Sequence, residues 1–179
     1  MNPLAFFLPG QRASSSTFFV GLFVLAVLDA VRLWALQQDF LADTGLVATI
    51  VPIGSMILMM LFVLFLFMNR RADAQRGPGL AFLPVGLSFL ARLIGAGAFV
   101  MIAGIGLTTE FAASQGQDMM AAAQDPAFQE QFEAWTEANP DATAGIQTTS
   151  AIISFVAFWV PAFLFGFWFA GMRPEVGEE

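Results

Sequence analysis

The chain has 179 residues, of which 58% are hydrophobic and 12% are charged, and its formal net charge is −7. Soluble globular domains carry roughly 25% charged residues, so this composition indicates a chain whose main solvent is the lipid bilayer. Histidine, cysteine and tyrosine are absent, which excludes disulfides, Cys or His catalysis and His-ligated metal or haem centres. We therefore expect no cofactor, no metal site and no enzymatic activity.

The first apolar segment, residues 17–36, predicts a membrane-spanning helix. At helical rise it is about 30 Å long, which matches the hydrocarbon thickness of a bilayer. The serines at 14–16 offer hydroxyls that can cap its first turn. Within the segment, Asp29 and Arg32 are three residues apart and share a helix face, so we expect them to form an intramembrane ion pair.

Residues 46–68 predict a second span, with Pro52 in its first turns, where proline is tolerated. A basic connector, residues 69–79, follows it. Because juxtamembrane cations attract anionic lipid, one hypothesis is that this connector binds lipid head groups or a partner's acidic surface. The alternative is that its arginines only set the topology. The residues concerned are Arg70, Arg71, Asp73 and Arg76.

Residues 80–107 form the third apolar segment, about 42 Å long as a helix, which is more than an upright span requires. We expect this helix to tilt or to begin along the surface, with Pro84 marking a bend. Arg92 is a third intramembrane charge, and its long side chain can extend back toward the basic side of the membrane.

The loop 108–145 contains acidic residues and no basic ones. Asp125 and Pro126 predict the start of a helix, and Asn139 followed by proline predicts its end. That helix is amphipathic, with Phe128, Phe132 and Trp135 on one side and glutamates on the other. We expect it to lie on the membrane surface or on the mouth of the bundle.

Residues 150–172 predict the fourth span. Small residues recur at helical spacing in the third and fourth spans and form flat strips that allow two helix backbones to approach closely in lipid. Such strips serve packing within the chain or contact with another protein, and the sequence favours neither. The residues are Gly95, Gly97, Gly104, Ala162, Gly166 and Ala170.

The cations that flank the spans predict the orientation. Arg12, the arginines of the connector and Arg173 all fall on one side, while the two alternate loops contain no cation. By the positive-inside rule that side is the cytoplasm. Both termini are then cytoplasmic, and the acidic loop 108–145 lies outside.

Two short motifs in the N-terminal half follow a known pattern. The matching positions are Arg12, Phe18, Arg70, Arg71, Asp73 and Arg76. They resemble the motifs Gly-Arg-x-x-Arg-x-x-Phe-Trp and Arg-Arg-Leu-His-Asp-x-Gly-Arg of a bacterial inner-membrane family described as domain of unknown function 805. The chain departs from these motifs at Gln11, Ser15, Phe19, Ala72 and Gln75. The resemblance implies a polytopic inner-membrane protein and supplies no activity.

The sequence thus predicts one all-α domain over residues 1–179, a four-helix transmembrane bundle with an amphipathic extracytoplasmic helix between its third and fourth spans. We expect it in the bacterial inner membrane as a non-catalytic accessory or structural subunit of a larger complex. The expected partners are membrane lipids, anionic ones included, and other integral membrane proteins, but not nucleic acid. The alternative is a small transporter or channel that uses Asp29, Arg32 and Arg92.

Overall fold

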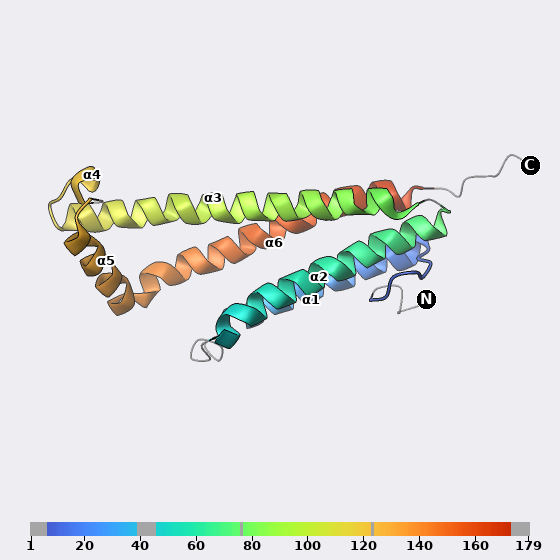
Figure 1. Ribbon diagram of the computed structural model, residues 1–179, viewed down its shortest axis with the longest axis horizontal. Helices are drawn as coiled ribbons and strands as arrows, with labels where there is room; N and C mark the ends of the chain where they lie inside the picture. Colours follow the sequence, from blue (N-terminus) through green and yellow to red (C-terminus); the bar gives the residue numbers. More distant parts are fainter. Residues whose placement is uncertain (1–6, 39–45, 76, 123, 173–179) are drawn as a thin grey trace, which may run out of the picture. The chain divides into compact units, whose positions relative to one another are not determined.

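The computed structural model describes residues 7–38, 46–75, 77–122 and 124–172. In these ranges the regular structure is helical, without strands (Figure 1). Four of the helices are long and apolar enough to cross a membrane: α1 (Ser15–Ala35), α2 (Leu46–Asp73), α3 (Phe82–Ser114) and α6 (Pro140–Ala170). This confirms the predicted all-α chain with four helices of membrane-spanning length, as expected of a multi-pass membrane protein.

The chain divides into two compact units, residues 1–92 with 155–179, and residues 93–154. The first unit contains α1, α2, the short 3-10 helix η3 (Pro78–Ala81), the start of α3 and the end of α6. The second contains the rest of α3 and α6 together with α4 (Met119–Ala122) and α5 (Pro126–Ala138). Because α3 and α6 contribute to both units, this division marks no linker, and the single-domain organisation stays a prediction.

Three of the four long helices extend beyond the predicted spans. Helix α2 continues past residue 68 to Asp73, α3 continues past residue 107 to Ser114, and α6 begins ten residues before the predicted position 150, at Pro140. Hydropathy identifies the residues that suit lipid. The backbone hydrogen bonds of a helix can continue beyond the membrane into water, so a helix can be longer than its apolar segment. In α2 the two cations of the last turn also interact favourably with the helix dipole.

The helix termini follow the predicted capping signals. Ser14 caps α1 by accepting a hydrogen bond from the backbone N–H of Thr17. Asp125 caps α5 by accepting from the N–H of Ala127, with Pro126 at the first helical position, where no N–H is needed. Pro84 lies in the first turn of α3, which follows η3, and the helix continues through it to Ser114, so the bend expected at Pro84 stays a prediction.

Aromatic, aliphatic and small residues form the core of the first unit. The ring of Phe67 on α2 meets Phe18 of α1 edge-on at 5.1 Å between centroids and Phe169 of α6 at 4.9 Å. Gly166 of α6 faces α1, where an added Cβ would lie 3.4 Å from a methyl group of Leu22. The two helices can approach this closely because position 166 has no side chain.

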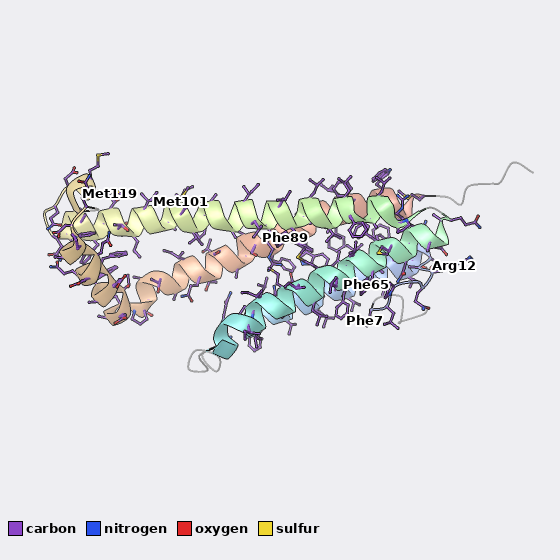
Figure 2. The ribbon with its side chains drawn as sticks, viewed as in Figure 1. Phe7, Arg12, Phe65, Phe89, Met101 and Met119 are labelled. Atoms are coloured by element: carbon purple, nitrogen blue, oxygen red, sulfur yellow. The ribbon has the colours of Figure 1, made fainter. Side chains whose placement is uncertain are left out.

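The second unit has its own smaller core at the end of α3. The Phe111 ring contacts all three aromatic rings of α5, with centroid distances of 5.3 Å to Phe128, 5.5 Å to Phe132 and 5.3 Å to Trp135. Elsewhere in this unit α3 presents large apolar side chains outward, such as Met101, which is 63% exposed (Figure 2). Such exposure suits a helix whose surroundings are lipid or another protein.

Candidate functional site

Asp29 is the most deeply buried charge of the first unit, with no exposed surface. Its Oδ1 accepts a 2.8 Å hydrogen bond from Nε of Arg32, and Arg32 Nη2 lies 2.8 Å from the same oxygen. The predicted ion pair between these residues is therefore confirmed. Arg32 Nη1 also donates to Oγ of Ser55 at 3.3 Å, which connects the pair to α2.

The second carboxylate oxygen of Asp29 binds α6. Nε1 of Trp159 donates a 2.9 Å hydrogen bond to Asp29 Oδ2 in a fully buried contact. The sequence did not single out Trp159 as a partner of Asp29. The available signal was that a buried indole N–H requires an acceptor, and Asp29 is the carboxylate inside a predicted span.

Arg92 of α3 completes this cluster, which we call the Asp29 cluster (Asp29, Arg32, Arg92 and Trp159). Its Nη1 lies 3.6 Å from Asp29 Oδ2, and its guanidinium carbon lies 5.8 Å from the centroid of the Phe158 ring. Arg92 is only 6% exposed, so it pairs inside the unit instead of extending to the membrane surface as expected. Since one carboxylate serves two guanidinium groups, both cations depend on Asp29.

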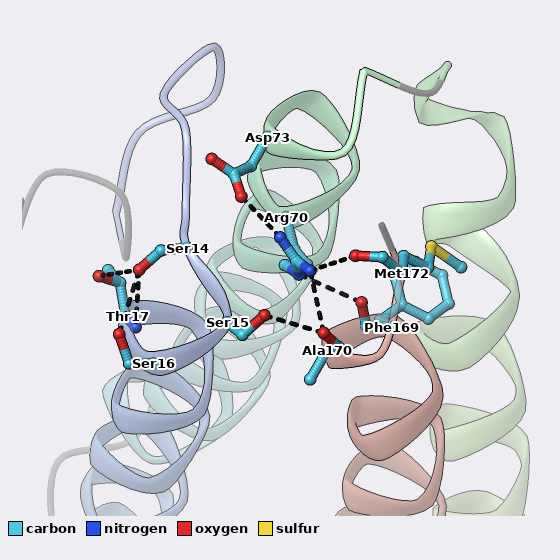
Figure 3. Close-up of polar contacts among 9 residues, drawn as sticks. All are labelled: Ser14, Ser15, Ser16, Thr17, Arg70, Asp73, Phe169, Ala170 and Met172. Carbon is cyan, nitrogen blue, oxygen red and sulfur yellow. Dashed lines mark hydrogen bonds and ion pairs between the residues drawn. The ribbon is translucent and has the colours of Figure 1, made fainter. Parts of the chain in front are cut away.

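A second polar layer lies at the C-terminal end of α2, where Arg70 binds the end of α6 (Figure 3). Arg70 Nε donates to the carbonyl of Phe169 at 3.1 Å, and Nη2 donates to the carbonyls of Ala170 and Met172 at 2.9 Å and 2.6 Å. Its Nη1 donates to Asp73 at 2.6 Å. The last carbonyls of a helix have no partner within the helix, so Arg70 supplies the missing donors.

The neighbouring Asn69 holds the segment that precedes α1. Its Nδ2 donates to the carbonyl of Leu8 at 2.7 Å, and its Oδ1 accepts from the backbone N–H of Gln11 at 3.1 Å. The backbone N–H of Ala13 donates to the Asn69 carbonyl at 3.2 Å. Asn69 thus holds the segment before α1, and the adjacent Arg70 holds the C-terminal end of α6, both at the same turn of α2.

The residues proposed for lipid or partner contact therefore differ in their surroundings. Arg70 is 4% exposed and makes four hydrogen bonds with its five N–H groups, so little donor capacity remains. Arg71 Nε donates to the carbonyl of Gly77, and its Nη1 has no partner. Arg76 lies outside the described residues, as does Arg173.

The small residues predicted to form packing strips also differ in their surroundings. Ala162 and Gly166 are buried against the first unit's core, so these two positions pack within the chain, and the carbonyl of Ala170 accepts from Ser15 Oγ and Arg70. A Cβ added at Gly97 or Gly104 would meet nothing within 4 Å. Gly95 is half-buried.

The predicted amphipathic helix forms as α5, and its apolar side rests on protein. Phe128 is 2% exposed because it packs on Phe111, while Glu130, Glu133 and Glu137 are exposed. Whether α5 lies on the outer side of a membrane stays a prediction.

Comparisons with protein-family models, curated proteins and solved structures return no match. The resemblance to domain of unknown function 805 consequently stays a prediction. Among the described residues, no three Asp or Glu side chains gather in a way that would hold a metal ion.

Proposed function

We propose that the chain is a non-catalytic integral membrane protein of the bacterial inner membrane that serves as an accessory or structural subunit of a larger membrane complex. The observation that carries this proposal is that its buried charged side chains bond to other parts of the same chain. Asp29 and Arg70 are occupied in joining the chain's own helices, at α1 to α6 and at α2 to α6. The groups that membrane chemistry would recruit are engaged in internal contacts.

The outward surface supports the same role. In the second unit, Ile94, Met101 and Ile102 of α3 are each more than 60% exposed, at 68%, 63% and 67%. The open strip formed by Gly97 and Gly104 lies on the same helix. In lipid, helices associate through close van der Waals packing at small residues, so this strip suits a helix of another membrane protein.

Solubilisation in mild detergent, followed by a native gel and mass spectrometry, tests the proposal. We expect stoichiometric co-migration with a larger complex, and we expect Gly104→Leu to weaken it because the added side chain blocks close approach. Gly106→Leu, at an open glycine on the opposite side of α3 from Gly104, is the matched control and should co-migrate normally. A lone small oligomer for the wild type would contradict the proposal.

The alternative is a small transporter or channel that uses Asp29, Arg32 and Arg92. The observation that favours it is that Arg92, distant in sequence, joins Asp29 and Arg32 in one cluster, and clustered intramembrane charges often mark ion paths. Asp29→Asn should then abolish flux across liposomes, whereas Glu130→Gln on exposed α5 should leave flux unchanged. Absence of wild-type flux over a panel of ions would exclude this alternative.

A further inference from the structure

An apolar groove runs between α2 and α3 within the first unit. Its volume is about 340 Å³, and its walls include Met60 and Leu64 of α2 and Val85, Gly86 and Phe89 of α3. Both helices are long and apolar enough to span a membrane. Phe82 at the end of the groove is 56% exposed, so the groove opens onto the surroundings of the helices. In a bilayer those surroundings are acyl chains.

The groove is open at Gly86 because this residue has no side chain. A Cβ built at this position would meet nothing within 4 Å. A side chain added at position 86 would therefore start in open space, at a residue that lines the groove. This position allows the groove to be filled by substitution.

A cation with unused donors lies on the same face of α2 as the groove. Leu64 and Arg71 are seven residues apart, which places them on nearly the same side of the helix and about 10 Å apart along its axis. Arg71 is only 7% exposed; its Nε donates to the carbonyl of Gly77, and its buried Nη1 has no acceptor among the described residues. Its guanidinium carbon lies 6.0 Å from the centroid of the Phe169 ring. Unlike Arg70, Arg71 thus has a buried donor that lacks a hydrogen-bond acceptor.

We infer that this groove holds an acyl chain of an anionic phospholipid whose phosphate binds Arg71. An acyl chain gains no hydrophobic free energy when it moves from lipid into an apolar groove, so the groove alone selects weakly. A phosphate supplies the charged acceptor that the guanidinium lacks, through short charge-assisted hydrogen bonds. The separation of about 10 Å between Arg71 and Leu64 leaves room for the glycerol backbone between phosphate and chain.

The inference depends only on the membrane-spanning part of the proposed function and is independent of the accessory role. Native mass spectrometry of the full chain, purified in mild detergent, measures the binding of added phosphatidylglycerol, phosphatidylcholine or inorganic phosphate. We expect the wild type to retain one phosphatidylglycerol under conditions in which phosphatidylcholine is lost. Inorganic phosphate should give no adduct, because it has no chain to fill the groove.

Two pairs of variants separate the groove from the charge. Gly86→Leu should lower phospholipid binding, whereas Gly106→Leu, at an open glycine of the same helix outside the groove, should leave it unchanged. Arg71→Gln should reduce the preference for phosphatidylglycerol over phosphatidylcholine about five-fold, the effect of one cation near anionic lipid. Arg12→Gln, which removes an exposed cation of the same predicted side, should not change this preference.

Equal binding of both phospholipids by the wild type would overturn the inference, as would equal binding by the Gly86→Leu and Gly106→Leu variants. Binding of inorganic phosphate as tightly as phosphatidylglycerol would replace it with a simple anion site. If Arg71→Gln fails to fold, the Gly86 pair still decides, because position 86 makes no contact that leucine would break. A native gel of the same samples reports complex association separately, so failure of the lipid site is distinguishable from failure of the accessory role.

Discussion

Nε1 of Trp159 donates a 2.9 Å hydrogen bond to Oδ2 of Asp29 across 130 residues of sequence. Trp159 lies about 16 Å from the C-terminal end of α6, and Asp29 lies about 21 Å from the N-terminal end of α1. Ser15 at the start of α1 donates to the carbonyl of Ala170 at the end of α6, so the two helices run antiparallel with these ends together. The indole and the carboxylate therefore meet deep within the first unit.

Trp159→Phe keeps the aromatic ring and removes the donor. We expect a loss of about 1–3 kcal/mol in the free energy of unfolding, because a buried carboxylate oxygen loses its hydrogen bond. Denaturant titration in detergent micelles measures this loss. Trp34→Phe is the matched control, since Trp34 is 64% exposed, and it should change stability little. Equal stability of the two variants would show that the Asp29 contact contributes nothing.

Arg70→Lys keeps the charge but removes the planar fork that reaches three carbonyls of the α6 terminus. We expect the last turn of α6 to open, with a loss of roughly 1.5–3 kcal/mol in local stability, because hydrogen bonds from a charged donor are lost. Amide hydrogen exchange of residues 165–172 measures this opening. Arg12→Lys, at an exposed position, should leave exchange unchanged. Normal protection of α6 in Arg70→Lys would contradict the capping role.

Phe111→Ala removes the ring on which all three aromatic side chains of α5 rest. We expect a local loss of roughly 3–5 kcal/mol, the range for deleting a buried phenylalanine. Limited proteolysis should then cut within Pro126–Ala138 much faster than in the wild type. Phe23→Ala, at a residue that is 64% exposed on α1, is the control. An unchanged cleavage rate would mean that α5 is held by other contacts.

The predicted orientation can be mapped directly because the chain has no cysteine. Ala72→Cys and Gln131→Cys each introduce one thiol at an exposed position, on α2 and α5 respectively. With a membrane-impermeant maleimide on intact cells stripped of their outer membrane, we expect Gln131→Cys to be labelled and Ala72→Cys to be protected. Labelling of Ala72→Cys alone would reverse the orientation derived from the arginines.

The sequence by itself determined the helical class, the four helices of membrane-spanning length and several of the helix ends. Each of these depends on residues close together in the chain: the length of an apolar run, the serines before α1, and Asp125 with Pro126 before α5. The ion pair of Asp29 with Arg32 was predictable for the same reason, since a spacing of three residues places two side chains on the same face of a helix. Hydropathy did not predict that α2 continues to Asp73, because it reports solvent rather than backbone conformation.

Only the tertiary structure decided which buried groups meet across helices. Trp159, Arg92 and Asp29 belong to three helices, and their meeting depends on the depth and rotation of each helix, which local patterns leave free. The same holds for Arg70, whose acceptors are backbone carbonyls near residue 170 that carry no sequence signature. The physical reason is that a residue's preference for lipid is a local property, whereas a buried charge finds its partner through the packing of the whole unit.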